Sequence, residues 1–194
     1  MRRKVIMDRK HFAPEVVAPA IILGIDPGTR VTGWGVISLA GTDPRALACD
    51  IIAPSAKWPL EQRLAHIFSE LGDVIARFSP TDMAVEEPFV GTNARSAMAI
   101  GEARTVAMLA ATLAGVAVHH YAPARIKQMV AGYGQGEKTQ VREMLRLQLG
   151  MAEAPADLNA SDALAVALCH AMQHQANTLI AAADGGRASR LLRK

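Results

Sequence analysis

Shortly after its basic start the chain reads Ile21-Ile22-Leu23-Gly24-Ile25-Asp26-Pro27-Gly28-Thr29. The branched apolar residues predict a buried strand, and the Pro-Gly pair marks the turn that ends it. Asp26 therefore lies at the carboxyl end of a strand. An Asp before Pro-Gly is more often a turn residue than a ligand, so its meaning depends on the other acids of the chain.

Two further acids occupy comparable positions. Glu86 ends the apolar run at 83–86 and precedes Glu87 and Pro88, and Asp162 opens the apolar run at 163–168. Each has an ordinary explanation, as a solvated strand end or as a favourable acid in a first helical turn. In an open α/β sheet, however, strand carboxyl ends and helix amino ends share one edge, where distant acids meet. Mg²⁺ and Mn²⁺ prefer oxygen ligands, and a pair of such ions clamps the oxygens of a phosphoryl displacement. The three acids together predict a metal-dependent phosphodiester site.

The composition predicts one cytoplasmic domain. At 194 residues and 20.6 kDa the chain is long enough for a real core. Its two cysteines, Cys49 and Cys169, lie in apolar runs without metal-ligand spacing, which indicates buried thiols in a reducing compartment. The apolar stretch before Ala18-Pro19-Ala20 is too short for a signal peptide. No run is long enough to span a bilayer.

Positive charge is concentrated at the two ends of the chain. Residues 1–20 hold five basic and two acidic side chains, and residues 183–194 hold four basic and one acidic. These tails contribute +6 to a total of +3, so the middle carries −3. Residues 88–150 nevertheless hold seven basic side chains against three acidic ones. This segment is locally positive, as a phosphate-binding face would be.

The periodicity predicts an α/β fold with a mixed five-stranded sheet flanked by helices on both faces. The first three strands follow one another as antiparallel hairpins, whereas later strand–helix–strand units imply parallel pairing. We expect a mobile basic extension over 1–20, the folded domain over 21–175 and a basic tail over 176–194. The predicted strands are 20–26, 32–39, 46–53, 82–86 and 116–120, and the predicted helices are 59–78, 93–114, 123–131, 137–149 and 162–175.

Two of the predicted helices have distinctive faces. The helix over 137–149 separates an apolar stripe from Lys138, Arg142 and Arg146, which recur every fourth residue as a basic ridge. A solvated face is the commoner explanation of such a stripe. The helix over 93–114 is rich in alanine, which favours close core packing first and a dimer interface second.

Several motifs follow one another along the chain and resemble one family. They lie at residues 24–37, 84–89, 93–97, 101–104, 126–128, 136–141 and 161–167. With them, the chain from about 21 to 175 resembles the RuvC-type Holliday junction resolvases. The resemblance implies an RNase H-like fold, a homodimer and two Mg²⁺ or Mn²⁺ ions per active site. It also implies paired nicking of opposing strands in a four-way DNA junction, with a RuvA/RuvB-type branch-migration complex as partner.

The resemblance also assigns roles to individual residues. Asp26, Glu86 and Asp162 match catalytic metal ligands of the family. Phe89 matches an aromatic that stacks on an unpaired base near the crossover, although a core position is its ordinary alternative. Lysines that approach the scissile backbone are matched by Lys127 and Lys138, and the second is also counted as catalytic. The further DNA-binding candidates are Arg95, Arg142 and Arg146.

One position departs from the family pattern. Asn159 stands three residues before Asp162, where the family usually has an acid and some members have a histidine. An Asn carbonyl oxygen can bind a metal, but it brings no negative charge and cannot act as a base. Natural variation, an alteration that traps substrate, and replacement of the ligand by Asp157 remain open. Asn159 is kept as the fourth metal ligand and a catalytic candidate.

Two other functions are compatible with parts of the sequence. Actin-like and sugar-kinase-like ATPases use a similar glycine turn on phosphates, but they duplicate the fold and need a second phosphate loop that this chain lacks. A catalytically weakened junction-binding protein is the other alternative, and it depends on Asn159.

Overall fold

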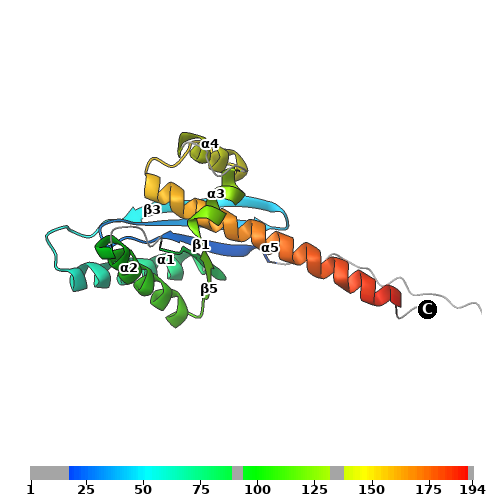
Figure 1. Ribbon diagram of the computed structural model, residues 1–194, viewed down its shortest axis with the longest axis horizontal. Helices are drawn as coiled ribbons and strands as arrows, with labels where there is room; N and C mark the ends of the chain where they lie inside the picture. Colours follow the sequence, from blue (N-terminus) through cyan, green and yellow to red (C-terminus); the bar gives the residue numbers. More distant parts are fainter. Residues whose placement is uncertain (1–17, 89–93, 132–137, 192–194) are drawn as a thin grey trace, which may run out of the picture.

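The computed structural model describes residues 18–88, 94–131 and 138–191. Its strands form one sheet in the order β3-β2-β1-β4-β5 (Figure 1). The strands are β1 (Ala20–Asp26), β2 (Thr32–Ala40), β3 (Asp43–Ile52), β4 (Asp82–Glu86) and β5 (Ala117–Tyr121). The helices are α1 (Leu60–Phe78), α2 (Ala94–Leu113), α3 (Pro123–Ala131), α4 (Lys138–Gln148) and α5 (Leu158–Leu191).

The sheet is mixed, as the sequence predicts. β1, β2 and β3 are joined by short turns and pair antiparallel, whereas β1 and β4, and β4 and β5, pair in parallel through helical crossovers. The hydroxyl of Thr32 closes the turn after β1, because it donates to the carbonyl of Gly28 at 2.7 Å and accepts from the Gly28 N–H at 3.3 Å. Arg63 of α1 holds the same turn through the carbonyl of Thr29 at 3.2 Å. The segment after Asp26 is thereby fixed on two sides.

Helices cover both faces of the sheet, and the residues of the central strands alternate between two cores (Figure 1). α3, α4 and α5 pack on one face, where Ile22 and Ala84 are buried. α1 and α2 cover the other face, where Leu23 and Val85 are buried. This alternation follows from the two-residue period of a strand. It also fixes the face on which each polar residue of β1, β4 and β5 lies.

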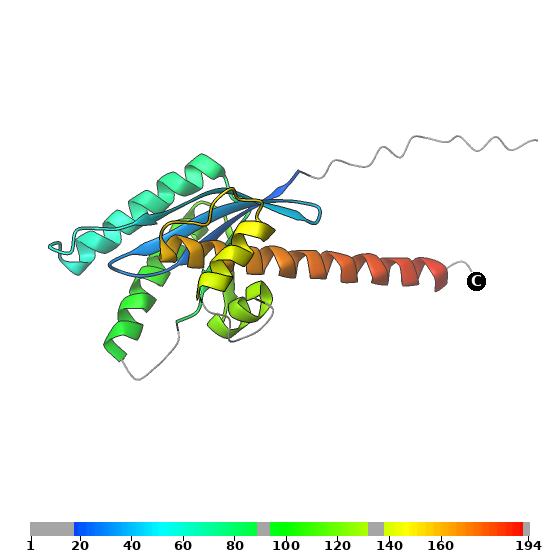
Figure 2. The same ribbon diagram turned by 90° about the horizontal axis from the view of Figure 1, so that it is seen from above.

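Three predicted boundaries differ from the structure by three residues or more. β3 begins at Asp43 instead of residue 46, and α5 begins at Leu158 instead of 162 and ends at Leu191 instead of 175. The early start of α5 has a local cause, because the Asp157 carboxylate accepts hydrogen bonds from the N–H groups of Asn159 and Ala160 at 2.7 and 3.4 Å. Those are the contacts of a helix N-cap. Beyond the sheet α5 continues as a projecting helix (Figure 2).

Both cysteines are free thiols; Cys169 is buried as expected, whereas Cys49 is only half-buried. Burial raises the pKa of Cys169 to about 11. Among the described helices, none is both long and apolar enough to cross a membrane. The predicted division at 175/176 falls within the continuous helix α5, and the N-terminal extension up to residue 17 lies outside the described residues.

Candidate active site

Asp26 and Glu86 lie side by side at one edge of the sheet. Each is the last residue of its strand, and the parallel pairing of Ile25 with Val85 brings the two strand ends into register. Neighbouring strands lie about 4.8 Å apart. Because Gly24 is buried beneath α5, the two-residue period places Asp26 on the α5 face, and the same holds for Glu86 on β4.

α5 brings the third acid to this edge. Asp162 lies in the first turns of the helix, on an exposed part of its surface. Burial raises the pKa of Glu86, the negative charge of Asp162 raises it further, and the positive charge of Lys127 lowers it. These effects require the three charges to be near one another. The structure thus gathers Glu86, Asp162 and Lys127 at the edge where Asp26 ends β1.

Close contact between α5 and the sheet depends on glycine. An added Cβ on Gly24 would lie 2.0 Å from the carbonyl oxygen of Ala163, and one on Gly33 would lie 2.0 Å from the carbonyl oxygen of Asn159. Gly33 is the register partner of Asp26 across the β1–β2 pair. The first turn of α5 therefore sits directly on the backbone beside Asp26. Sequence reasoning missed these positions, although glycines within buried strands signal close backbone approach.

Asn159 and Asp157 have different positions at the start of α5. Asn159 is in the helix three residues before Asp162, so the two residues share a face. The side-chain amide nitrogen (Nδ2) of Asn159 donates to the Asp157 carboxylate at 3.0 Å. That bond and the N-cap bonds lower the pKa of Asp157. Asp157 is thus occupied as the cap of α5, which argues against it as a substitute metal ligand.

The predicted DNA-binding residues are distributed unevenly. Lys127 is exposed on α3 and acts electrostatically on Glu86. Phe89 lies outside the described residues, as do the side chains of Arg95, near the start of α2, and Lys138, at the start of α4. Their predicted roles therefore stay predictions.

Arg142 and Arg146 of the basic ridge bind protein atoms. Arg142 donates to the carbonyl of Pro155. The Arg146 guanidinium pairs with Glu143 at 2.6 Å and donates to the carbonyl of Met151 at 3.3 Å. Both arginines thereby connect α4 to the loop that leads into α5. Their contacts explain the conformation of this loop, and any DNA contact would be made in addition.

The chemistry of this edge is that of a cation-binding centre. Three carboxylates and one amide oxygen are hard donors, and like charges gathered in a partly desolvated place favour a bound divalent cation. A lysine at the rim adds a positive charge for an anionic ligand.

Comparison with known proteins places the chain in a family. The family described as "Crossover junction endodeoxyribonuclease RuvC" matches residues 22–170. A protein of that name from Dehalococcoides mccartyi is 45% identical over 163 residues, which cover 84% of this chain and 98% of that protein. Another from Maricaulis maris is 44% identical and covers 84% of this chain and 96% of that protein.

Solved structures agree with this result. The structure of Thermus thermophilus RuvC in complex with a Holliday junction substrate superposes with a TM-score of 0.77 at 36% identity and covers 82% of this chain and 97% of that chain. The yeast mitochondrial Holliday junction resolvase Ydc2, at 10% identity and a TM-score of 0.56, shares the fold. With its mixed sheet and acid-bearing edge, this chain belongs to the RuvC family of crossover junction endodeoxyribonucleases, whose fold is RNase H-like.

Proposed function

We propose that this chain is a metal-dependent endonuclease that resolves four-way DNA junctions by paired nicks in opposing strands, during recombination and repair. One observation carries the proposal. Asp26 and Glu86 end adjacent parallel strands in register, and Asp162 approaches from α5 closely enough to raise the pKa of Glu86. Family membership supplies the reaction class, and these acids supply the ligands.

The donor set fits Mg²⁺ or Mn²⁺. Asp26, Glu86 and Asp162 would hold the ions with Asn159 as a neutral fourth ligand, and two ions per site is the number that the family resemblance suggests. When bound, the ions would supply positive charge to the oxygens of the scissile phosphodiester. The raised pKa of Glu86 supports this assignment, because a cation would offset the burial and the repulsion by Asp162 that disfavour its charged form.

The protein's own groups position the DNA. Lys127 lies at the rim, where its ammonium would bind a non-bridging phosphate oxygen of the cleaved strand. Lys138, Arg95 and Phe89 are proposed to add a second cation, a backbone contact and a stacked base. The turn after β1, which Thr32 and Arg63 hold, keeps Asp26 fixed while the strand is bound.

A homodimer fits the two nicks of one junction, since each subunit would cut one strand. The outer face of α2 supports this proposal, because Met98, Leu109 and Leu113 recur on one side of the helix and are 68%, 50% and 71% exposed. Such a row of apolar side chains is the kind of surface that a second subunit covers. A RuvA/RuvB-type branch-migration complex is the proposed partner, and the cytoplasm is the proposed location.

A weakened, junction-binding protein is the second candidate, and Asn159 is the observation that favours it. Family membership removes the ATPase alternative. Incubation of the purified chain with a synthetic four-way junction and Mg²⁺ separates the remaining two. An endonuclease gives symmetrical, ligatable nicks that the Asp162→Asn variant does not give. If the wild-type chain shifted the junction in a gel but produced no nicks in the DNA, only the binding function would remain.

A further inference from the structure

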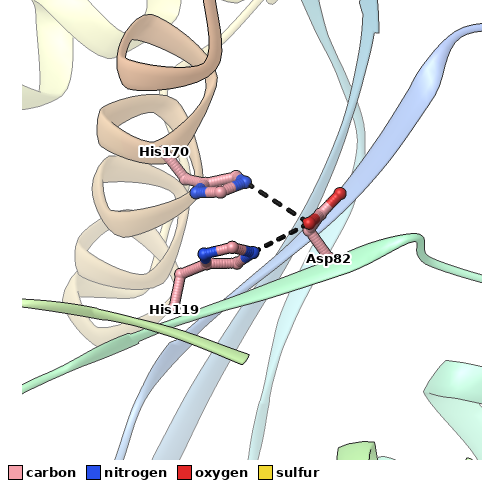
Figure 3. A group of neighbouring side chains, drawn as sticks. All are labelled: Asp82, His119 and His170. Atoms are coloured by element: carbon pink, nitrogen blue, oxygen red, sulfur yellow. Dashed lines mark hydrogen bonds and ion pairs between the residues drawn. The ribbon is translucent and has the colours of Figure 1, made fainter. Parts of the chain in front are cut away.

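A second group of polar side chains lies under α5, away from the acids. It consists of Asp82 at the start of β4, His119 in β5 and His170 in α5 (Figure 3). Asp82 and Glu86 are four residues apart on one strand, which corresponds to about 13 Å. Asp162 and His170 are eight residues apart on α5, or about 12 Å. The group is therefore separate from the acid-bearing edge.

The ligand-type atoms of the three residues point toward one another. His119 Nε2 lies 2.8 Å from Asp82 Oδ1, and His170 Nε2 lies 3.8 Å from the same oxygen (Figure 3). One ligand atom from each residue falls within 4.8 Å of the others. The two imidazole rings are 4.2 Å apart between centroids. Three segments that are far apart in sequence thus converge on one small volume.

His170 carries an unsatisfied nitrogen into this volume. The residue is only 4% exposed, and its Nε2 has no hydrogen-bond partner among the described residues. Its Nδ1 lies 2.8 Å from the hydroxyl of Tyr121. A buried nitrogen without a hydrogen-bond partner is destabilising. The orientation of His170 Nε2 toward Asp82 and His119 therefore needs an explanation. A bound cation would satisfy it.

We propose that Asp82, His119 and His170 bind one divalent transition-metal ion of the zinc type. Imidazole nitrogen and carboxylate oxygen are ordinary ligands of Zn²⁺, at about 2.0–2.2 Å. Ligand atoms at that distance from a tetrahedral ion are about 3.4 Å from one another. The distance from His119 Nε2 to Asp82 Oδ1 would therefore lengthen from 2.8 Å, and the distance from His170 Nε2 to the same oxygen would shorten from 3.8 Å. Water would complete the coordination.

The surroundings match those of a metal site. A ligating imidazole usually binds a polar group through its second nitrogen, and a ligating carboxylate is itself hydrogen-bonded. Tyr121 holds the second nitrogen of His170, and the hydroxyl of Thr81 donates to Asp82 Oδ2 at 2.7 Å. Burial lowers the pKa of His170 to about 4, and the neighbouring His119 and His174 lower it while Asp82 raises it.

The ion would link β4, β5 and α5, so its role is structural and independent of cleavage. The sequence conceals the group, because its members are 37 and 51 residues apart and share no motif. The strand pairing in the structure reveals it. Because His119 pairs with Ala84, its imidazole lies on the sheet face covered by α5, and the next residue, His120, lies on the opposite face.

The test is a titration of the full-length, chelator-treated protein with ZnCl₂. It is performed calorimetrically in excess Mg²⁺ and in the Asp26→Asn/Asp162→Asn background, so that the acid-bearing edge does not contribute. We expect one Zn²⁺ per chain. At a free zinc concentration of 100 times Kd, the folded-to-unfolded ratio rises about 100-fold, which corresponds to a Tm increase of about 5–10 °C.

Matched variants locate the ion. Asp82→Asn and His119→Gln should abolish the Tm increase, and Tyr121→Phe should weaken zinc binding about 10–100-fold. His120→Gln, on the neighbouring residue but the opposite face, should bind zinc like the parent chain. The metal-free Tm of each variant shows that it is folded at the titration temperature. The proposal would be overturned if the parent chain bound no zinc. It would also be overturned if His119→Gln and His120→Gln bound zinc equally well.

Discussion

Replacement of Gly33 by alanine should damage the candidate site through the position of α5. The added Cβ would lie 2.0 Å from the carbonyl oxygen of Asn159 and 2.4 Å from its carbon, both of them backbone atoms. Restoring an ordinary contact of about 3.5 Å requires the first turn of the helix to move away by about 1.5 Å. We expect this overpacking to lower the free energy of unfolding by about 1–3 kcal/mol.

The effect on cleavage should exceed the effect on stability. The displaced turn carries Asn159 and Asp162, while Asp26 stays on the sheet beside Gly33. A misplacement of about 1 Å at a reacting centre costs on the order of 100-fold in rate. Single-turnover cleavage of a four-way junction at saturating Mg²⁺, at a temperature where the variant is fully folded, measures this loss.

Gly72 provides the matched control. It lies in α1, and an added Cβ would meet no atom within 4 Å. Gly72→Ala should keep the wild-type cleavage rate and raise the free energy of unfolding by about 0.5–1 kcal/mol, because alanine favours the helix. If Gly33→Ala cleaved at the wild-type rate and unfolded at the wild-type urea concentration, the proposed contact between α5 and the sheet would not position the site.

Further predictions concern the acids and the DNA. Asp26→Asn should lower the cleavage rate about 100-fold or more while junction binding in a gel-shift assay survives, because the acid holds metal and not DNA. Asn159→Asp should increase cleavage at low Mg²⁺, since it adds a negative ligand beside Asp162; an unchanged Mg²⁺ titration would contradict this. Asp157→Ala should lower the free energy of unfolding by about 0.5–2 kcal/mol through loss of the cap, whereas Asp157→Asn should retain cleavage; loss of cutting in the latter would make Asp157 a ligand. Junction affinity should fall steeply with salt in a titration of binding, and a flat dependence would count against phosphate contacts by Lys127 and its neighbours. Because the folded-state pKa of Glu86 is raised, the metal-free protein should lose stability as pH rises from the ordinary glutamate pKa through the raised one. Glu86→Gln should therefore unfold at a higher temperature than the wild type at neutral pH without metal, yet fail to cleave.

The strands and their pairing could be predicted from the sequence because they depend on local patterns. The apolar run before Asp26 and the short turns after β1 and β2 determine strands and hairpins within a few residues of chain. The apolar run at 163–168 predicts a helix that begins at residue 162, four residues after the start of α5 at Leu158. The residue that starts it is Asp157, which acts through hydrogen bonds to Asn159 and Ala160. A polar capping residue ahead of an apolar run is the sequence signal that indicates this earlier start.

The interior of the site could be predicted only in part. The positions of Asp26, Glu86 and Asp162 at element ends predict that they meet at one edge of the sheet, and the parallel register of β1 and β4 aligns the two strand ends that carry Asp26 and Glu86. The partners of the arginines could not be found in this way. Arg146 pairs with Glu143 one helical turn away, but its bond to Met151 depends on how the chain turns after α4. Contacts of that kind arise from tertiary packing, which the periodic pattern of apolar residues in the sequence does not predict.

The dependence of the proposed site on α5 has a consequence for the newly made protein. α5 is the last of the described elements, and it brings Asp162 to strand ends that were synthesised more than seventy residues earlier. While residues after 157 are still inside the ribosome, a nascent chain can pair β1 with β4 but holds only two of the three carboxylates. Folding during synthesis proceeds from the N-terminus. If the proposed ligand assignment holds, a chain on a translating ribosome lacks the third carboxylate and should not cut DNA until α5 has emerged and docked.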